Sequence, residues 1–427
     1  MSDRHIMVVN VFFAPNTYGG ATVVAEEVAR ALTRQTGWRI TAVSLICRDD
    51  LIPYAVIKSA AQGIDSYLIN IPAIRSYAEA YNNPHVTEQI GALIDRLKPD
   101  LLHCHCLQDV GAGTIEAAKA RDLPVILSLH DYWWICERQF MTRPDNRYCG
   151  QAPVTLAACH GCVANMSAAR TRQATLFRQA AQADIVTYPS HFALDLCETS
   201  GLAPGRGVVW TNGVHPPGPA FTDQQARRRN CDPRIAFGYL GGPSPIKGWP
   251  DIRAAFAGMT RDDFRVVLAD GSPDKNWWHK QTFTDLPGEW EVAPRFAQSR
   301  IDRFYARIDV LLFPSQWKET FGLAIREALA RGIAVIQTDS GGTTEHAARD
   351  PGAFIPIDAG PGPLRQRIEA TLNKPRPCPS PLPMLSFDDQ AAAFEDMARA
   401  LWRREVEDAG DSQDTGARPR KMVGQNM

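Results

Sequence analysis

The chain has 427 residues, of which 44% are hydrophobic and 22% are charged. This length and composition are typical of a globular protein with two domains of ordinary size. The formal net charge is -1 and the sequence contains no long basic run, so we expect no binding of nucleic acid.

The N-terminal segment is short and polar, and an apolar run at 6–13 follows it directly. It lacks the long apolar region and the small-residue cleavage site of a signal peptide. No stretch of the sequence approaches the ~20 apolar residues that a membrane-spanning helix requires. We therefore expect a cytoplasmic protein, with at most peripheral contact at the inner face of the plasma membrane.

Short apolar runs alternate with helical patterns from one end of the chain to the other. Runs this short and rich in Val, Ile and Leu predict parallel strands that are buried on both faces. Their alternation with helices such as Thr22–Leu32 and Asp251–Ala257 predicts an α/β fold with two doubly wound domains. The expected strands are Ile6–Phe13, Arg39–Ile46, Leu101–His105, Val125–His130, Ile185–Tyr188, Gly207–Thr211, Arg234–Tyr239, Arg265–Ala269, Trp290–Ala293, Val310–Phe313, Ile333–Gln337 and Ala353–Ile355.

The periodicity is interrupted between the two halves by a cluster of prolines and the triplet Arg227-Arg228-Arg229, and a proline-rich stretch at 375–383 ends the second half. The triplet is expected to face solvent, with contact to anionic lipid as the alternative. The polar C-terminal tail has the composition of a disordered segment. The expected parts are a first domain at 1–215, a linker at 216–231, a second domain at 232–385, an amphipathic helix at 386–406 and the tail at 407–427.

The first predicted strand leads into a glycine pair, Gly19-Gly20, and then into a helix. Such a pair at a strand–helix junction lets the backbone approach a ligand closely. The dinucleotide-binding fingerprint is not matched, because its third glycine is absent. The pair therefore predicts either a ligand-binding loop or a plain turn.

A histidine, His130, closes the fourth predicted strand at the sheet edge where open α/β sheets bind ligands. A structural role for this histidine is the alternative. The aromatic run Tyr132-Trp133-Trp134 follows it and predicts either a platform for an acceptor or a buried cluster.

Four cysteines lie within one segment at 136–162, which we interpret as an insertion in the first domain. Disulfides are rare in the cytosol, so metal binding is one explanation, and four thiolates would make a closed structural zinc site. Reduced buried cysteines or a disulfide are the alternatives. The four residues are Cys136, Cys149, Cys159 and Cys162.

A second group, His103-Cys104-His105-Cys106, also contains residue types that bind metals. Alternate side chains of a strand point to opposite faces of the sheet. The two histidines and the two cysteines would therefore be separated, which favours an ordinary strand end over a metal site.

The most informative stretch runs from the predicted strand Val310–Phe313 into a helix that Phe321-Gly322 opens. Glu319 precedes the helix and Glu327 lies within it, so their carboxylates would stand on the order of 10 Å apart. This separation matches that between the sugar and the ribose of a nucleotide sugar. The free N–H groups of the helix N-terminus between them favour a phosphate. Taken singly, each glutamate is also consistent with an ordinary surface residue of a helix.

This stretch resembles the donor-site signature of retaining glycosyltransferases of family 4. That signature is Glu, seven residues, Glu, then Ala-x-Ala-x-Gly and a later Gly-Gly-x-x-Glu, as in 319–345. The resemblance implies the GT-B fold, in which two Rossmann-like domains face a central cleft and the last helix crosses back to the first domain. It also implies hexose transfer from a UDP- or GDP-linked sugar to a glycan or lipid-linked oligosaccharide, in surface polysaccharide or glycolipid assembly. No cofactor or bound Mg²⁺ is implied for catalysis, since no Asp-x-Asp motif stands at a strand end.

The resemblance also implies roles for individual residues. Glu319 would hold the sugar hydroxyls, Glu327 the ribose hydroxyls and Lys247 the diphosphate. His130 would contact the donor sugar near the reacting carbon. The catalytic set is His130, Glu319 and Lys247, and the donor-binding set is Gly19, Gly20, Lys247, Gly248, Glu319, Thr320, Phe321, Gly322, Leu323 and Glu327.

One position departs from the family pattern. Gly242 stands where the family has an arginine that binds the diphosphate. A charge-assisted hydrogen bond of this kind is typically worth ~1.5–3 kcal/mol, unless Arg295 or Lys318 replaces it. The departure leaves open a catalytically silent partner subunit, and a nucleotide-sugar epimerase of the same fold is the other alternative.

Overall fold

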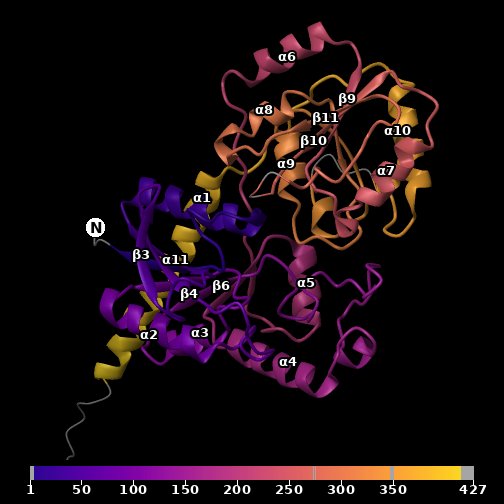
Figure 1. Cartoon of the computed structure of the whole chain (residues 1–427). Helices are drawn as coiled ribbons and strands as arrows, with labels where there is room; N and C mark the ends of the chain where they lie inside the picture. Colours follow the sequence, from indigo (N-terminus) through magenta and orange to yellow (C-terminus); the bar gives the residue numbers. More distant parts are fainter. Residues whose placement is uncertain (1–3, 273, 275, 347–350, 415–427) are drawn as a thin grey trace, which may run out of the picture.

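Two α/β domains, each with its own sheet, make up the chain (Figure 1). The structure is a computed structural model that describes residues 4–272, 274, 276–346 and 351–414. The sheet of the first domain has eight strands in the order β3-β4-β2-β1-β5-β6-β7-β8, and that of the second has five in the order β11-β10-β9-β12-β13. All pairs are parallel except β3 with β4, which confirms the predicted doubly wound architecture.

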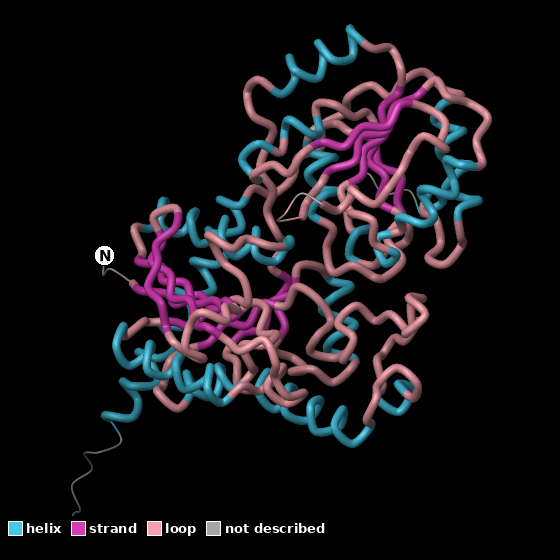
Figure 2. The backbone as a smooth tube through the Cα atoms, viewed as in Figure 1, coloured by secondary structure: helices cyan, strands magenta, loops and turns pink. Residues whose placement is uncertain are grey.

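The first domain buries its sheet between two layers of helices. Helices α2 to α5 pack on one face, and α1 packs on the other (Figures 1 and 2). Asparagine or serine side chains cap α2, α4 and α5, which satisfies N–H groups that a helix leaves free at its start. The strands are β1 His5–Val9, β2 Arg39–Ile46, β3 Val56–Ala61, β4 Ile64–Asn70, β5 Leu101–Cys104, β6 Val125–Ser128, β7 Ile185–Tyr188 and β8 Gly207–Val209, and the helices are α1 Gly19–Thr36, α2 Pro84–Leu97, α3 Gly113–Lys119, η1 Leu156–Cys159, α4 Met166–Ala180 and α5 His191–Thr199.

The second domain repeats this arrangement on a smaller sheet. Helices α7 and α10 cover one face, and α8, α9 and the start of α6 cover the other. The strands are β9 Ile235–Tyr239, β10 Phe264–Ala269, β11 Glu289–Ala293, β12 Val310–Phe313 and β13 Ala334–Gln337. The helices are α6 Phe221–Cys231, η2 Pro245–Lys247, α7 Trp249–Ala257, η3 Gln298–Arg300, α8 Asp302–Tyr305, α9 Leu323–Ala330, η4 Gly342–Thr344, η5 Pro351–Ala353 and α10 Pro361–Leu372.

The last helix, α11 (Phe387–Asp414), returns to the first domain and lies against α1 (Figure 1). Phe394 is fully buried there, and Trp402 donates a hydrogen bond from Nε1 to the backbone oxygen of Asp100 at 3.0 Å. The predicted crossing of this helix is thus confirmed. Among the described residues, no helix is long and apolar enough to cross a membrane.

Several expected elements differ from the structure. The range 353–355 forms only a single bridge, between Ile355 and Thr338, instead of a strand. The hairpin of β3 and β4 was not expected at all. The tail expected to be disordered is helical as far as Asp414, and residues 415–427 lie outside the described part of the chain.

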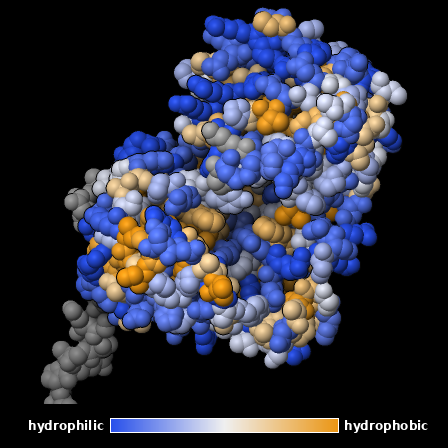
Figure 3. All heavy atoms as spheres, in the orientation of Figure 1, coloured by the Kyte–Doolittle hydropathy of each residue, from blue (hydrophilic) through white to orange (hydrophobic). Residues whose placement is uncertain are grey.

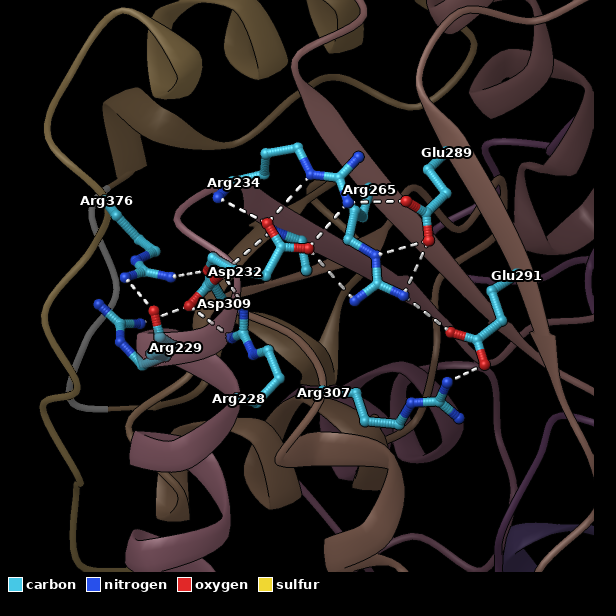
Figure 4. Close-up of polar contacts among 11 residues, drawn as sticks. Arg228, Arg229, Asp232, Arg234, Arg265, Glu289, Glu291, Arg307, Asp309 and Arg376 are labelled. Carbon is cyan, nitrogen blue, oxygen red and sulfur yellow. Dashed lines mark hydrogen bonds and ion pairs between the residues drawn. The ribbon is translucent and has the colours of Figure 1, made fainter.

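The expected linker at 216–231 contains helix α6, which packs on the second domain through Phe221. Its arginines are not simply solvated. Arg228 donates to Asp309 at 2.8 Å, and Arg229 pairs with the same buried carboxylate (Figure 4). The expectation of a solvated triplet is therefore wrong for these two residues, because an acidic side chain at the start of β12 binds both.

Candidate functional site

The residues singled out by the sequence gather between the two domains, at the carboxyl ends of the strands. Figure 3 shows a hollow between the domains on the face in view. Thr320 of the second domain donates from Oγ1 to the backbone oxygen of His130 at 2.7 Å. Ser190 of the first domain donates from Oγ to the backbone oxygen of Thr320 at 2.6 Å. These contacts hold the segment before α9 against the end of β6.

An ion pair lies at the centre of the residues that the second domain places at the candidate site. Lys247 Nζ stands 2.7 Å from Glu319 Oε1, and Ser315 Oγ donates to the same oxygen at 2.7 Å. The lysine side chain is 33% exposed and the glutamate side chain 10%, so solvent reaches the cation more easily than the carboxylate. Gly248 follows with φ 80°, and a Cβ there would lie 1.9 Å from the oxygen of Pro314. Only glycine fits this turn, which fixes Lys247 at the site.

The N-terminus of α9 opens beside this pair. Gly322 caps the helix in a left-handed conformation with φ 83°. Within the described residues, the backbone N–H groups of Phe321, Gly322 and Leu323 donate to no backbone acceptor. Free N–H groups and the positive end of the helix dipole together favour an anion at this point.

Glu327 lies one turn inside α9 and is only 5% exposed. Its carboxylate accepts hydrogen bonds from Gln298 Nε2 at 2.5 Å and from Tyr305 OH at 3.0 Å. Burial raises the pKa of the Glu327 carboxyl group, while these two donors act in the opposite direction. Neither donor was identified from the sequence, because each reaches Glu327 from a separate segment.

The first domain contributes a stack of histidines. His130 Nε2 lies 2.8 Å from His105 Nδ1, with the rings nearly parallel. His103 lies next to His105, and its Nε2 lies 2.8 Å from Ser128 Oγ. Burial lowers the pKa of His130 to about 4 and that of His103 to about 3, so both rings are neutral near pH 7.

The glycine pair lies directly opposite α9. Helix α1 begins at Gly19, and a Cβ on Gly20 would come within 3.1 Å of Leu323 Cδ1. The preceding loop is tied to the second domain as well, since Arg295 Nη2 donates to the oxygen of Thr17 at 3.1 Å. The structure thus places this loop at the N-terminus of α9.

Gly242, the departure from the family pattern, lies under a tryptophan. Its φ is 63°, and a Cβ there would stand 2.7 Å from the ring of Trp277. An arginine at 242 would need Trp277 to move. Lys318, one expected substitute, instead stands 3.2 Å from Asp339 and donates to its backbone oxygen.

The aromatic run behind His130 forms a buried cluster. Tyr132 is 0% exposed, and Trp317 of the second domain packs edge-on against its ring. Trp133 and Trp134 are buried too. The acceptor-platform interpretation of this run is therefore wrong, and the alternative of a buried cluster holds.

Another carboxylate joins the domains. Glu345 accepts hydrogen bonds from the backbone N–H groups of His191 at 3.0 Å and Phe192 at 2.7 Å, at the start of α5. It belongs to the Gly-Gly-x-x-Glu part of the signature, but in this structure it binds the first domain. No local pattern in the sequence indicates this contact.

The four cysteines of the 136–162 segment are free thiols in the structure. They lie in one region, where Cys149 and Cys159 add to the burial that raises the pKa of Cys136 to about 11. Among the residues that the structure describes, no group of three or more His, Cys, Asp or Glu side chains is arranged to hold a metal ion. The thiols as placed do not fit zinc, so the zinc site stays a prediction from spacing that metal analysis of the purified protein can test.

Comparison with known proteins matches both domains to family models. Residues 18–216 match the model described as Glycosyltransferase Family 4, and residues 223–375 match that of Glycosyl transferases group 1. The two matches meet at the domain boundary.

Two curated relatives share part of the sequence. An uncharacterized glycosyltransferase, YqgM of Bacillus subtilis (strain 168), is 27% identical over 144 residues, which are 33% of this chain and 40% of the relative. A GDP-mannose-dependent alpha-mannosyltransferase of Mycolicibacterium smegmatis (strain ATCC 700084 / mc(2)155) is 31% identical over 150 residues, which are 34% of this chain and 35% of the relative. The similarity therefore spans well under half of the length of either relative.

Solved structures resemble the chain over nearly its whole length. Sucrose-phosphate synthase from Thermosynechococcus elongatus has a TM-score of 0.64 at 16% identity, covering 95% of this chain and 100% of its own. Anabaena Alr3699/HepE in complex with UDP and glucose has a TM-score of 0.60 at 15% identity, covering 96% and 100%. At such low identity the likeness shows the fold, and that fold is GT-B.

Proposed function

Because the chain belongs to glycosyltransferase family 4, we propose that it transfers a hexose from a nucleoside-diphosphate sugar to an acceptor hydroxyl, with retention of the anomeric configuration. The observation that carries this proposal is the ion pair of Lys247 and Glu319 beside the free N–H groups of α9. A cation, a carboxylate and the anion-binding N-terminus of a helix therefore lie next to each other, which suits a diphosphate joined to a sugar.

Donor binding would rearrange this pair. The diphosphate oxygens would accept hydrogen bonds from the N–H groups of Phe321, Gly322 and Leu323 and from Lys247. Lys247 would then turn from Glu319 to the phosphate, which frees the carboxylate to accept hydrogen bonds from the sugar hydroxyls. Once the nucleotide sugar is bound, these N–H groups and the lysine are in place before the leaving group gains charge. This arrangement stabilises a transition state most effectively.

Glu327 would bind the ribose at the far side of the diphosphate. Its carboxylate is held by Gln298 and Tyr305, so its position is fixed before the donor enters. A ribose hydroxyl could donate to either carboxylate oxygen, because each oxygen accepts more than one hydrogen bond.

His130 would contact the sugar from the first domain. Its Nε2 is engaged with His105, so its Nδ1 is the atom left for a substrate hydroxyl. A neutral imidazole can donate or accept a hydrogen bond there without adding positive charge near the reacting carbon. No step of this scheme uses a metal or a cofactor.

The identity of the donor base and of the acceptor is a separate part of the proposal. One similar structure contains UDP, and one relative is described as GDP-mannose-dependent, so we propose UDP- or GDP-linked sugars as donors. A glycan or lipid-linked oligosaccharide is proposed as the acceptor, in the assembly of a surface polysaccharide or glycolipid.

A panel of UDP, GDP, ADP and their sugars tests the donor by thermal shift. A ligand at 100 times its Kd stabilises a folded protein by about 2.7 kcal/mol, so one nucleotide should raise the Tm clearly. Glu319→Ala should lose the shift with the nucleotide sugar more than the shift with the free nucleotide. A panel without any shift would contradict the proposal.

The reaction itself is tested by NMR with the donor found in this way. Anomeric proton signals of the product should show the same configuration as in the donor. A donor sugar that changes into its epimer without any acceptor would instead indicate an epimerase. Tight binding of the donor without turnover, across a panel of acceptors, would indicate a silent partner subunit.

A further inference from the structure

A second pocket opens on the second domain, at the opposite end of α9 from the candidate donor site. Its volume is about 460 Å³. One wall is helix α6, and the other is the segment at 376–381 that follows α10. The lining residues are Pro217, Phe221, Thr222, Gln225, Ala226, Arg229, Asn230, Ala330, Arg331, Arg376, Pro379 and Pro381.

The pocket carries excess positive charge. Three arginines and no acidic residue are among its lining residues, and one of the three, Arg331, is paired with Asp302 at 2.6 Å. Arg229 shares the single carboxylate of Asp309 with Arg228, so two guanidinium groups stand against one negative charge (Figure 4). Arg376 donates only to backbone oxygens, those of Asp232 at 2.8 Å and Arg229 at 2.9 Å, and forms no ion pair with any described residue.

A buried hydrogen-bond donor without an acceptor lines the same pocket. Gln225 is 4% exposed, and its Nε2 has no partner among the described residues. Buried polar groups are nearly always paired in folded proteins, and an unpaired one signals an unseen partner such as water, an ion or a ligand. The oxygen of an anion would supply the missing acceptor.

The remaining lining is apolar. Phe221, at the start of α6, lines the pocket with the 4% of its surface that the core of the second domain leaves exposed, and three prolines and two alanines are also among the lining residues. An inorganic ion would leave this surface in contact with water. A ligand with an apolar body would cover it.

We propose that this pocket binds a small organic anion, with its carboxylate or phosphate group at Arg376 and Gln225 and its apolar body against Phe221. The proposal does not depend on the reaction proposed for the cleft. Arg331 connects the pocket to two other parts of the molecule. It donates hydrogen bonds to the backbone oxygens of His215 at 3.2 Å and of Glu327 at 3.1 Å. A bound anion would thus lie beside both the chain that joins the domains and the helix that carries Glu327.

Titration calorimetry of the full chain with benzoate, phenyl phosphate and neutral benzamide tests the proposal. We expect at least one of the two anions to bind with a Kd at least fivefold lower than that of benzamide, and inorganic phosphate to bind more weakly than phenyl phosphate. Saturating UDP should leave the binding of the anion in place. Equal binding of benzamide, equal binding of inorganic phosphate or displacement by UDP would overturn the proposal.

Variants locate the binding in the pocket. Arg376→Gln and Gln225→Leu should each raise the Kd about fivefold or more, and Ala226→Trp, which fills the pocket from an exposed position of α6, should abolish binding. Arg227→Gln is the matched control, because Arg227 lies on the same helix but is exposed and outside the lining. Thermal melting shows whether each variant is folded. An unchanged Kd in folded Ala226→Trp, or equal loss in Arg227→Gln, would refute the proposed site.

Discussion

The two sides of the cleft contribute different kinds of polar groups. The second domain presents an ion pair, Lys247 with Glu319, and the positive end of a helix. The first domain presents a stack of histidines that burial keeps neutral, ending in His130. Both sets follow strands of a parallel sheet, where ligands of such folds bind.

This difference assigns separate tasks to the two sides. A charged group in a partly buried site interacts strongly with a charged ligand, but it is costly to leave unpaired. The second domain therefore suits the diphosphate, which brings its own charge. The first domain suits the sugar and the acceptor, which need hydrogen bonds without charge. The predictions below test this division, beginning with the change expected to have the largest effect.

The strongest test removes the cation of the second domain. Lys247→Met keeps the length of the side chain but leaves the leaving group without its positive charge and Glu319 without its partner. Removing one preorganised electrostatic contact of this kind typically lowers kcat by about 100-fold or more, and we expect a loss of that size. Steady-state kinetics with the donor found by thermal shift measures it.

Lys318→Met is the matched control for this variant. Lys318 directly precedes Glu319 in the segment between β12 and α9, but it pairs with Asp339. We expect its kcat to stay within about threefold, since an exposed ion pair contributes little. A loss as large as that of Lys247→Met would mean that Lys318 replaces the missing arginine at 242.

A smaller loss is expected at the ribose end of the donor. Glu327→Gln keeps the shape of the side chain but removes the charge that a ribose hydroxyl would meet. A charge-assisted hydrogen bond corresponds to roughly 10-fold in affinity, so the donor KM should rise by about that factor with little change in kcat. A fall in kcat with an unchanged KM would place Glu327 at the reacting sugar instead.

The first domain should respond more weakly still. His130→Asn removes one neutral hydrogen bond, typically worth about 1 kcal/mol, and should lower kcat by about fivefold. Burial lowers the pKa of His130 to about 4, so this ring should cause no inflection in the pH profile of kcat near pH 6.5. The profiles of the wild type and of His130→Asn should therefore have the same shape around that pH. Such an inflection would show that the ring is charged during the reaction and would contradict the division between the two sides.

The sequence predicted the fold well because the strands are short, continuous apolar runs that are buried on both faces. It missed the β3 and β4 hairpin, whose strand Val56–Ala61 is partly exposed and has no such run. The prediction that Arg228 and Arg229 are solvated was wrong, because their partner Asp309 lies about 80 residues later in the sequence and no local pattern indicates the contact.

The candidate site was predictable where a local motif carries it. Glu319, Gly322 and Glu327 lie on one strand–helix unit, so their spacing alone predicted that Glu319 precedes α9, that Gly322 caps it and that Glu327 lies within it. Contacts between separate segments were not predictable in this way. Glu345 at the start of α5 and Trp277 over Gly242 depend on how distant parts of the chain meet, which no local pattern encodes.

The smallest effect on turnover is expected from His103, which lies at the inner end of the histidine stack and should instead show itself in stability. Burial lowers the pKa of this ring to about 3 in the folded protein, while an unfolded histidine titrates near pH 6.5. Between these values the unfolded chain binds the extra proton, so the free energy of unfolding falls as the pH falls below about 6.5. Each such histidine contributes a slope of at most about 1.4 kcal/mol per pH unit.

His103→Gln, which can still bond Ser128, should make the fall between pH 6.5 and 5 shallower by up to this amount in urea titrations. His85→Gln, at an exposed position of α2, is the matched control. An unchanged slope in His103→Gln would mean that this ring is protonated in the folded protein, and the neutral character of the first domain's side would then be wrong.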